Sequence, residues 1–236
     1  MQSLITSFST GMEAVFGDML AKKEMESLKK SFNYYGMLLS VVSMILLSTT
    51  AVMIIPFVKL YTSGITDADY IIPFFAFLMI VTTIVFCVRM PYNAMVVAAG
   101  LFKETKVAAY GEVLINVFLS IVLVKTIGLA GVAIGTLAGT LFRFLYYVGY
   151  FSENIIKISP WLFVKRVLNN ALIFAVAFFA GNRVLDYVNI TNYFNWAMVA
   201  AVVAVISVVV TLAINFMFYK NDLSEVISRY IKIVKK

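Results

Sequence analysis

A run of 24 residues without a single charge, 196–219, is the feature that most restricts how this chain can fold. A helix needs about 20 predominantly apolar residues to cross the hydrocarbon core of a bilayer, which is roughly 30 Å thick. Inside that core every backbone N–H and C=O must be bonded within the protein, and a helix achieves this with its own residues. The run therefore predicts a transmembrane helix.

Five further apolar runs predict that the chain crosses the membrane six times as an all-α integral membrane protein. The composition agrees, because 62% of the residues are hydrophobic and 13% are charged, whereas soluble domains are about 25% charged. The second run is expected to continue past Arg89 and Pro91 toward Gly100 as a kinked helix. The predicted spans are residues 34–60, 71–88, 107–124, 129–150, 167–188 and 196–219.

The distribution of basic residues predicts the orientation of the chain. Of the 19 basic residues, fourteen fall in one alternating set of loops and three in the other, and Arg89 and Arg143 lie in or at the edge of spans. Cytoplasmic loops are enriched in Lys and Arg, so we expect a multi-pass protein of the cell membrane with a cytoplasmic C-terminus. The net charge of +7 therefore reflects topology, and no nucleic-acid partner is expected.

Both ends of the chain are predicted to lie outside the six spans. Residues 1–33 read as a partial helix followed by a cytoplasmic amphipathic segment, and apolar residues at helical spacing over 20–32 suit a short helix on the membrane surface. Residues 220–236 read as a basic cytoplasmic tail that forms an interfacial helix, with Asp222 and Glu225 as a capping box. Between the ends we expect a four-helix part of a transporter lobe over residues 34–151 and an additional helix pair over residues 152–219.

Several chemistries are excluded by composition. The chain has no histidine and one cysteine, Cys87, so it has no imidazole proton relay, no His-containing metal site and no internal disulfide. It also lacks the glycine-rich strings that cradle nucleotides. We expect no enzymatic activity, no metal and no cofactor.

The stretch 103–150 is the strongest candidate for a functional site. It predicts a transmembrane hairpin that turns near Ile127, with Glu112 lying 15 residues before the turn and Arg143 lying 16 residues after it. In an antiparallel hairpin the two charges reach nearly the same depth, in the cytoplasmic half of the membrane. They either form an ion pair or contribute jointly to a polar cavity. Glu112 is also the one candidate proton carrier within a span.

Two stripes with a four-residue spacing mark the faces of this hairpin. In the third span the stripe is Glu112, Asn116 and Ser120, which cannot face lipid cheaply. In the fourth span, glycines form a face without side chains, which predicts close packing against a neighbouring helix. Arg143 continues this stripe, and its side chain either extends to the cytoplasmic surface or faces a cavity. The glycines are Gly131, Gly135 and Gly139.

Two other polar features have alternative interpretations. Arg89, beside Pro91, is either an interfacial anchor or the mouth of a cavity that attracts anions. A third stripe, in the last span, is interpreted as interhelical hydrogen bonding. Its members are Ser207, Thr211 and Asn215.

The order of several loose motifs carries a resemblance to a known family. The chain contains LYTSGITDADYIIP and then RMPYNAMVVAAGLFKETKVAAYGEVLINVFLSIVLVKTIGLAGVAIGTLAG. These runs resemble the C-terminal lobe of Wzx-like polysaccharide flippases of the multidrug/oligosaccharidyl-lipid/polysaccharide exporter superfamily. The opening FGDMLAKKEMESLKKSF resembles the loop after the second helix of that lobe.

The resemblance implies that the protein moves an undecaprenyl-pyrophosphate-linked oligosaccharide from the inner to the outer leaflet for polysaccharide biosynthesis. Basic residues that line the central cavity of such flippases would meet the lipid diphosphate, and guanidinium groups suit that cargo because they bind phosphate oxygens bidentately. The implied partners are this lipid-linked oligosaccharide, membrane lipids and the polysaccharide synthesis machinery. The substrate-binding candidates are Arg89 and Arg143, Lys103 and Lys106 at the cytoplasmic rim, and Glu112 and Asn116.

The family has two lobes of about six helices, and the chain resembles one lobe without its first helix and part of its second. Transport would therefore require the missing N-terminal lobe or a partner chain. Two alternatives stay open: half of a cation-coupled multidrug exporter, which would be expected to carry more intramembrane carboxylates, and a non-transporting scaffold of envelope glycan assembly.

Overall fold

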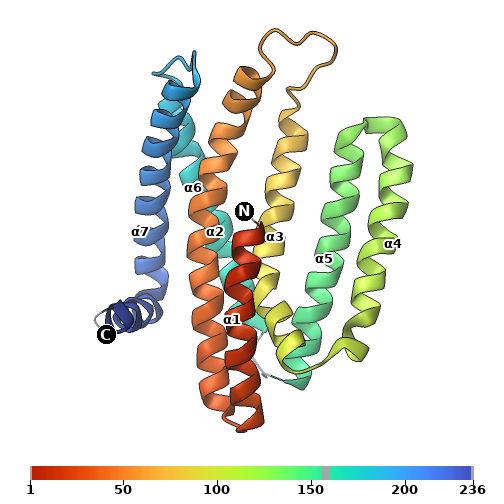
Figure 1. The fold of residues 1–236 in the computed structure, drawn as a ribbon, viewed down its shortest axis with the longest axis vertical. Coiled ribbons are helices and arrows are strands. Elements are labelled where there is room, and N and C mark those ends of the chain that lie inside the picture. Colours follow the sequence, from red (N-terminus) through yellow and green to blue (C-terminus); the bar gives the residue numbers. More distant parts are fainter. Residues whose placement is uncertain (1, 156–159, 235–236) are drawn as a thin grey trace. The chain divides into compact units, whose positions relative to one another are not determined.

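The computed structural model describes the backbone of residues 2–155 and 160–234, and over these residues it is all-α (Figure 1). Seven helices follow one another along the described parts of the chain, and six of them are long and apolar enough to cross a membrane. The predicted fold class and the number of spans are therefore confirmed. The helices are α1 (Gln2–Ala21), α2 (Met25–Tyr61), α3 (Pro73–Ala98), α4 (Phe102–Ile127), α5 (Leu129–Asn154), α6 (Pro160–Leu185) and α7 (Tyr193–Val234).

The helices are generally longer than the apolar runs that predict them. Helix α3 continues through Arg89 and Pro91 to Ala98, as expected for the second span. Helix α6 begins at Pro160, before its predicted start at residue 167. Hydropathy indicates only the part of a helix that suits the lipid core. Helical backbone hydrogen bonding continues into the polar residues at either end, so the helices extend beyond the apolar runs.

The segment predicted to lie on the membrane surface folds differently. Helix α1 ends at Ala21, a turn follows in which Lys23 has a φ of 59°, and α2 then runs without interruption from Met25 into the first span. Leu28 and Phe32 are buried. The prediction of a separate amphipathic helix over residues 20–32 is therefore wrong, because residues 25–32 are the first turns of α2. Leu28 and Phe32 pack against protein, while Met25 is exposed.

The chain forms two compact units, each built from discontinuous segments. Unit 1 comprises residues 1–40 and 81–165, and unit 2 comprises residues 41–80 and 166–236. Helices α2 and α3 each contribute one part to each unit. The segments predicted along the chain, with limits at residues 33, 151 and 219, stay a prediction.

Aromatic side chains form much of the core of unit 1. The Phe32 and Tyr92 rings meet edge-on at 5.1 Å, which joins α2 to α3. Tyr92 also packs edge-on against Phe151 of α5. One turn further along α2, the buried Tyr35 hydroxyl donates to Ser9 Oγ of α1 at 2.9 Å. These contacts fix α3 and α5 close together, which brings the charged residues of the two helices near each other.

Unit 2 combines a small apolar core with hydrogen bonds between helices. Val52 and Val203 are buried, and the Trp196 indole N–H donates to the Met53 carbonyl oxygen at 3.1 Å. In the stripe on α7, the Thr49 hydroxyl donates to Ser207 Oγ at 3.3 Å. A further buried bond joins Asn169 Nδ2 to Asn215 Oδ1 at 3.2 Å. Ser207 and Asn215 therefore make interhelical hydrogen bonds, as predicted, whereas the buried Thr211 hydroxyl has no hydrogen-bond partner among the described residues.

The last part of α7 changes direction at Tyr219, whose φ of −136° and ψ of 37° are not helical. Figure 1 shows the following turns leaving the axis of the span. The bend falls at the end of the charge-free run, where the predicted tail begins. The predicted cap formed by Asp222 and Glu225 lies outside the described side chains, and the position of the tail on the membrane surface stays a prediction.

Candidate functional site

Helices α4 and α5 form the predicted hairpin, and a seam of glycines holds their backbones together. Gly128 makes the turn with a φ of 59°, a conformation that glycine adopts without strain. Along the seam there is no room for a side chain, since a Cβ on each glycine would lie about 2.5 Å from an atom of α4. The contacted atoms are the Leu123 carbonyl carbon for Gly131, Ser120 Oγ for Gly135 and the Glu112 carbonyl oxygen for Gly139. The predicted close packing is confirmed.

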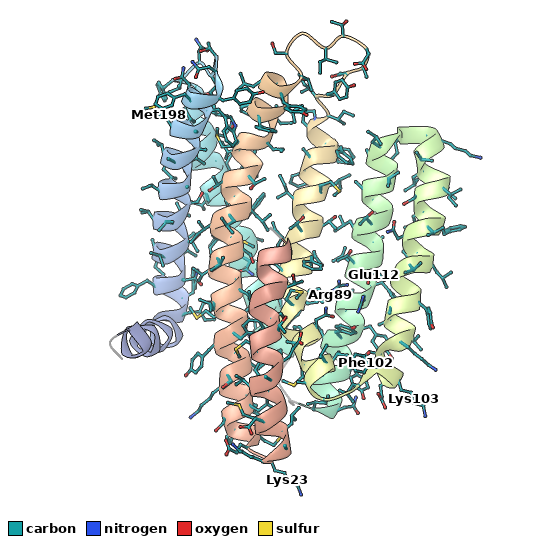
Figure 2. All side chains as sticks on the ribbon, viewed as in Figure 1. Lys23, Arg89, Phe102, Lys103, Glu112 and Met198 are labelled. Carbon is teal, nitrogen blue, oxygen red and sulfur yellow. The ribbon has the colours of Figure 1, made fainter. Side chains whose placement is uncertain are left out.

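Three charged side chains from three helices of unit 1 meet beside this seam. Arg89 Nη1 on α3 donates to Glu112 Oε1 at 2.8 Å, and Arg143 Nη1 on α5 donates to Glu112 Oε2 at 2.7 Å. Figure 2 shows Arg89 reaching toward Glu112 on the adjacent hairpin. We call Arg89, Glu112 and Arg143 the charge cluster. Of the two interpretations of the matched depth, the ion pair between Glu112 and Arg143 is present.

Aromatic residues support both guanidinium groups. Arg143 Nε donates to the Tyr147 hydroxyl at 2.9 Å, and its guanidinium carbon lies 5.3 Å from the centre of the same ring. The guanidinium carbon of Arg89 lies 5.5 Å from the centre of the Phe86 ring. Aromatic faces attract cations, most strongly where water is scarce. Both guanidinium groups therefore have an aromatic contact in addition to their contact with Glu112.

The charge cluster is largely buried and carries a net positive charge. The exposed fractions of the side chains are 5% for Arg89, 19% for Glu112 and 24% for Arg143. One carboxylate faces two guanidinium groups, and guanidinium stays charged in proteins. A buried charge without full compensation is costly and marks a functional candidate when it lies within a membrane span. Because Arg89 is buried and bound to Glu112, it is not the interfacial anchor that the sequence allowed.

The hydrogen-bonding capacity of Arg89 is largely unused. Its Nε is buried and has no hydrogen-bond partner among the described residues. A guanidinium presents a planar fork of N–H donors that can hold two oxygens of one carboxylate or phosphate. Each arginine contacts Glu112 through one terminal nitrogen only. Hydrogen-bond donors therefore remain on both guanidinium groups in addition to those that bind Glu112.

The other predicted site residues do not join the charge cluster. Asn116 Oδ1 accepts hydrogen bonds from Ser120 Oγ at 3.0 Å and from Thr136 Oγ1 at 3.4 Å, which ties it into the hairpin. Lys103 and Lys106 are exposed at the start of α4, and Figure 2 shows Lys103 away from Arg89 and Glu112. The role of the two lysines at the rim stays a prediction.

Sequence reasoning singled out Arg89 but did not connect it to Glu112. Glu112 and Arg143 can be paired from sequence because they belong to one hairpin. The number of residues from the turn to each of them gives their relative depth. Arg89 belongs to the preceding helix, and its facing direction depends on how α3 packs against the hairpin. A signal that could have suggested the contact is that Arg89 and Glu112 are both charged residues near the same predicted side of consecutive spans.

Two further features of the described residues are relevant to possible sites. Unit 2 has an open groove of about 270 Å³ between α2 and α7 that contains no charged residue among those described. No group of three or more Cys, Asp or Glu residues within the described part of the chain is placed to hold a metal ion. The groove is lined by Thr49, Thr50, Met53, Ile54, Phe57, Trp196 and Ala200.

Fold and site together define a multi-pass α-helical membrane protein with a buried, cationic charge cluster. Comparison with known proteins goes no further: no protein-family model, no curated protein and no solved structure matches the chain.

Proposed function

We propose that this chain is one lobe of a flippase for lipid-linked oligosaccharides and that its charge cluster binds the diphosphate of the cargo. The observation that carries the proposal is the buried cluster of two arginines around one glutamate, in which Arg89 Nε has no partner among the described residues. Guanidinium groups hold phosphate oxygens in fixed geometry and remain charged at any physiological pH. Such a cluster inside membrane-spanning helices suits an anionic headgroup on a lipid.

The environment of Glu112 favours this function over cation-coupled drug export. A coupling carboxylate must take up and release a cation during the transport cycle. Both oxygens of Glu112 already accept hydrogen bonds from guanidinium groups, at 2.8 Å and 2.7 Å. A carboxylate that is bound by two permanently charged guanidinium groups is a poor carrier for a further cation. Structural neutralisation or ligand exchange therefore suits Glu112 better than proton transport.

Binding can be tested with the 236-residue chain in lipid nanodiscs that contain undecaprenyl diphosphate or, as a matched probe without the anion, undecaprenol. We expect the chain to bind the diphosphate in preference to the alcohol. Arg143→Gln should weaken binding about tenfold or more, because a charge-assisted contact to phosphate is lost. The matched control is Arg183→Gln, which removes a guanidinium whose side chain is 82% exposed, and it should leave binding unchanged.

Equal binding of the diphosphate and the alcohol would rule out recognition of the headgroup. Unchanged binding by a folded Arg143→Gln protein would rule out the charge cluster as the site. Inorganic pyrophosphate provides a third arm, and if it competes as well as the lipid does, the cargo need not be a lipid. Full transport would additionally require a second lobe, supplied by a longer chain or a partner.

A further inference from the structure

The way in which Glu112 is held suggests that its contacts are exchangeable. A carboxylate bound by one arginine through two parallel hydrogen bonds fills the guanidinium fork. Here each arginine offers Glu112 a single terminal nitrogen, so Glu112 fills neither fork. Arg143 Nε donates instead to the Tyr147 hydroxyl, and Arg89 Nε has no partner among the described residues. An anion with more oxygen atoms could satisfy both forks better than Glu112 does.

We infer that Glu112 is a resident competitor for the anionic ligand, which occupies the two arginines when the ligand is absent and is displaced when it binds. The inference rests on the proposed function of Arg89 and Arg143 as a diphosphate site. It adds that Glu112 sets the affinity, and that the return of its carboxylate promotes release of the ligand.

The charges in the charge cluster explain why a competitor would be useful. Without Glu112, two buried guanidinium groups would hold a diphosphate with no group ready to replace it, and release would leave both charges without a partner. Glu112 supplies one negative charge in the empty state, so the buried arginines are never wholly uncompensated. Its single charge is nevertheless weaker than that of a diphosphate, so the ligand can displace it.

The proposed displacement would move the carboxylate while the helix stays in place. The carbonyl oxygen of Glu112 lies against Gly139, where a Cβ would come within 2.5 Å. The backbone is therefore fixed by the glycine seam, and displacement requires only rotation of the glutamate side chain. Glu112 and Arg143 are the more exposed members of the cluster, so a ligand can approach from their side.

The test compares the wild-type chain with Glu112→Gln in nanodiscs, measuring the Kd and the dissociation rate of undecaprenyl diphosphate. The apparent Kd is inversely proportional to the fraction of protein that is free to bind, so a larger free fraction gives a lower apparent Kd. We expect Glu112→Gln to bind about tenfold more tightly and to release the lipid more slowly. The matched control is Glu104→Gln on the same helix, where the residue is exposed, and it should bind like the wild type.

Because Glu112→Gln leaves two arginines without a counter-ion, its folding is monitored by the thermal shift that the ligand produces. The shift should be larger than in the wild type, since the diphosphate replaces the missing charge. Glu112→Asp is a second variant that keeps the charge but shortens its reach, and its affinity should lie between the other two. If Glu112→Gln does not fold, the comparison of Glu112→Asp with the wild type decides the question.

Two outcomes separate this inference from the proposed function. If the wild type binds the diphosphate through Arg143 but the glutamate variants bind equally or more weakly, Glu112 is a structural counter-ion and the competitor role is overturned. If no folded protein prefers the diphosphate to undecaprenol, the proposed function fails, and the inference fails with it.

Discussion

Glu112 differs from the two arginines because it is the one negative charge in the charge cluster. Replacing it with glutamine leaves two buried guanidinium groups without compensation, and breaking a buried pair in this way costs about 3–5 kcal/mol. Replacing Arg143 with glutamine leaves the neutral pair of Arg89 and Glu112, so about 1.5–3 kcal/mol is expected from the lost charged hydrogen bonds. Ligand-free Glu112→Gln should therefore be less stable than Arg143→Gln in unfolding titrations with SDS.

The control for this ranking is Glu26→Gln. Glu26 pairs with Lys29 at 3.5 Å, and its side chain is 84% exposed, so its loss should change stability by no more than about 1 kcal/mol. If Arg143→Gln proves the more damaging of the two cluster variants, the charge balance of the cluster does not govern stability.

At the residue scale the sequence predicts part of the charge cluster. Glu112 and Arg143 lie at nearly equal numbers of residues from the turn at Gly128, which predicts that they lie at the same depth. The structure shows that they form an ion pair. The contact from Arg89 could not be derived, because the rotation of α3 about its own axis is set by aromatic contacts such as that between Tyr92 and Phe151. The two rings are distant in sequence, and no regular residue spacing predicts that they are in contact.

At the scale of elements, the hairpin of α4 and α5 depends on its glycine seam. A methyl group at Gly135 would meet Ser120 Oγ at 2.5 Å and the Asn116 carbonyl oxygen at 2.8 Å. Backbone cannot yield as a flexible side chain can, so Gly135→Ala should push the helices apart and cost about 1–3 kcal/mol. Thermal unfolding in detergent measures the loss.

Gly149→Ala is the matched control on the same helix, because no described atom lies within 4 Å of the position that its added methyl group would take. It should be neutral or stabilising by up to about 1 kcal/mol, since alanine is the better helix former. Equal effects of the two substitutions would show that the seam is not tightly packed.

Helices α6 and α7 are joined by a buried amide pair, Asn169 and Asn215. Interhelical hydrogen bonds in membranes contribute about 0.6 kcal/mol on average by double-mutant cycles. A cycle with Asn169→Ala and Asn215→Ala should give a coupling energy of that size, measured by SDS unfolding. Strictly additive single effects would mean that the two amides do not stabilise each other.

Apolar length predicts the spans well, because desolvation of the backbone leaves few alternatives to helix in lipid. It does not predict what covers an amphipathic face. Over residues 20–32 the pattern fits a membrane surface and a protein surface equally. Burial of Leu28 and Phe32 shows that protein covers part of this face, while Met25 is exposed. Helix ends are likewise placed by local bonding such as the turn at Lys23.

For the whole molecule, the count of basic residues predicts which loops face the cytoplasm. We expect a cysteine at position 66, in the exposed loop between α2 and α3, to react with a membrane-impermeant maleimide in intact cells. A cysteine at position 24, in the exposed turn between α1 and α2, should react only after permeabilisation. The variants are Thr66→Cys and Glu24→Cys in a Cys87→Ala background, where the native cysteine is buried.

Labelling of the Glu24→Cys protein in intact cells, with protection of the Thr66→Cys protein, would reverse the orientation. It would also place the charge cluster in the outer half of the membrane. The Cys87→Ala protein without an added cysteine shows the background reaction.

The glycine seam also bears on how the chain enters the bilayer. A lone charged residue at the centre of an inserting helix costs about 2.5–3.5 kcal/mol. Glu112 and Arg143 are separated by 31 residues and face each other across one tight turn. Once α5 has been synthesised, the hairpin can close backbone to backbone while still beside the translocon, and the two charges can leave it as a neutral pair. Arg143 would then enter the bilayer with its charge already paired.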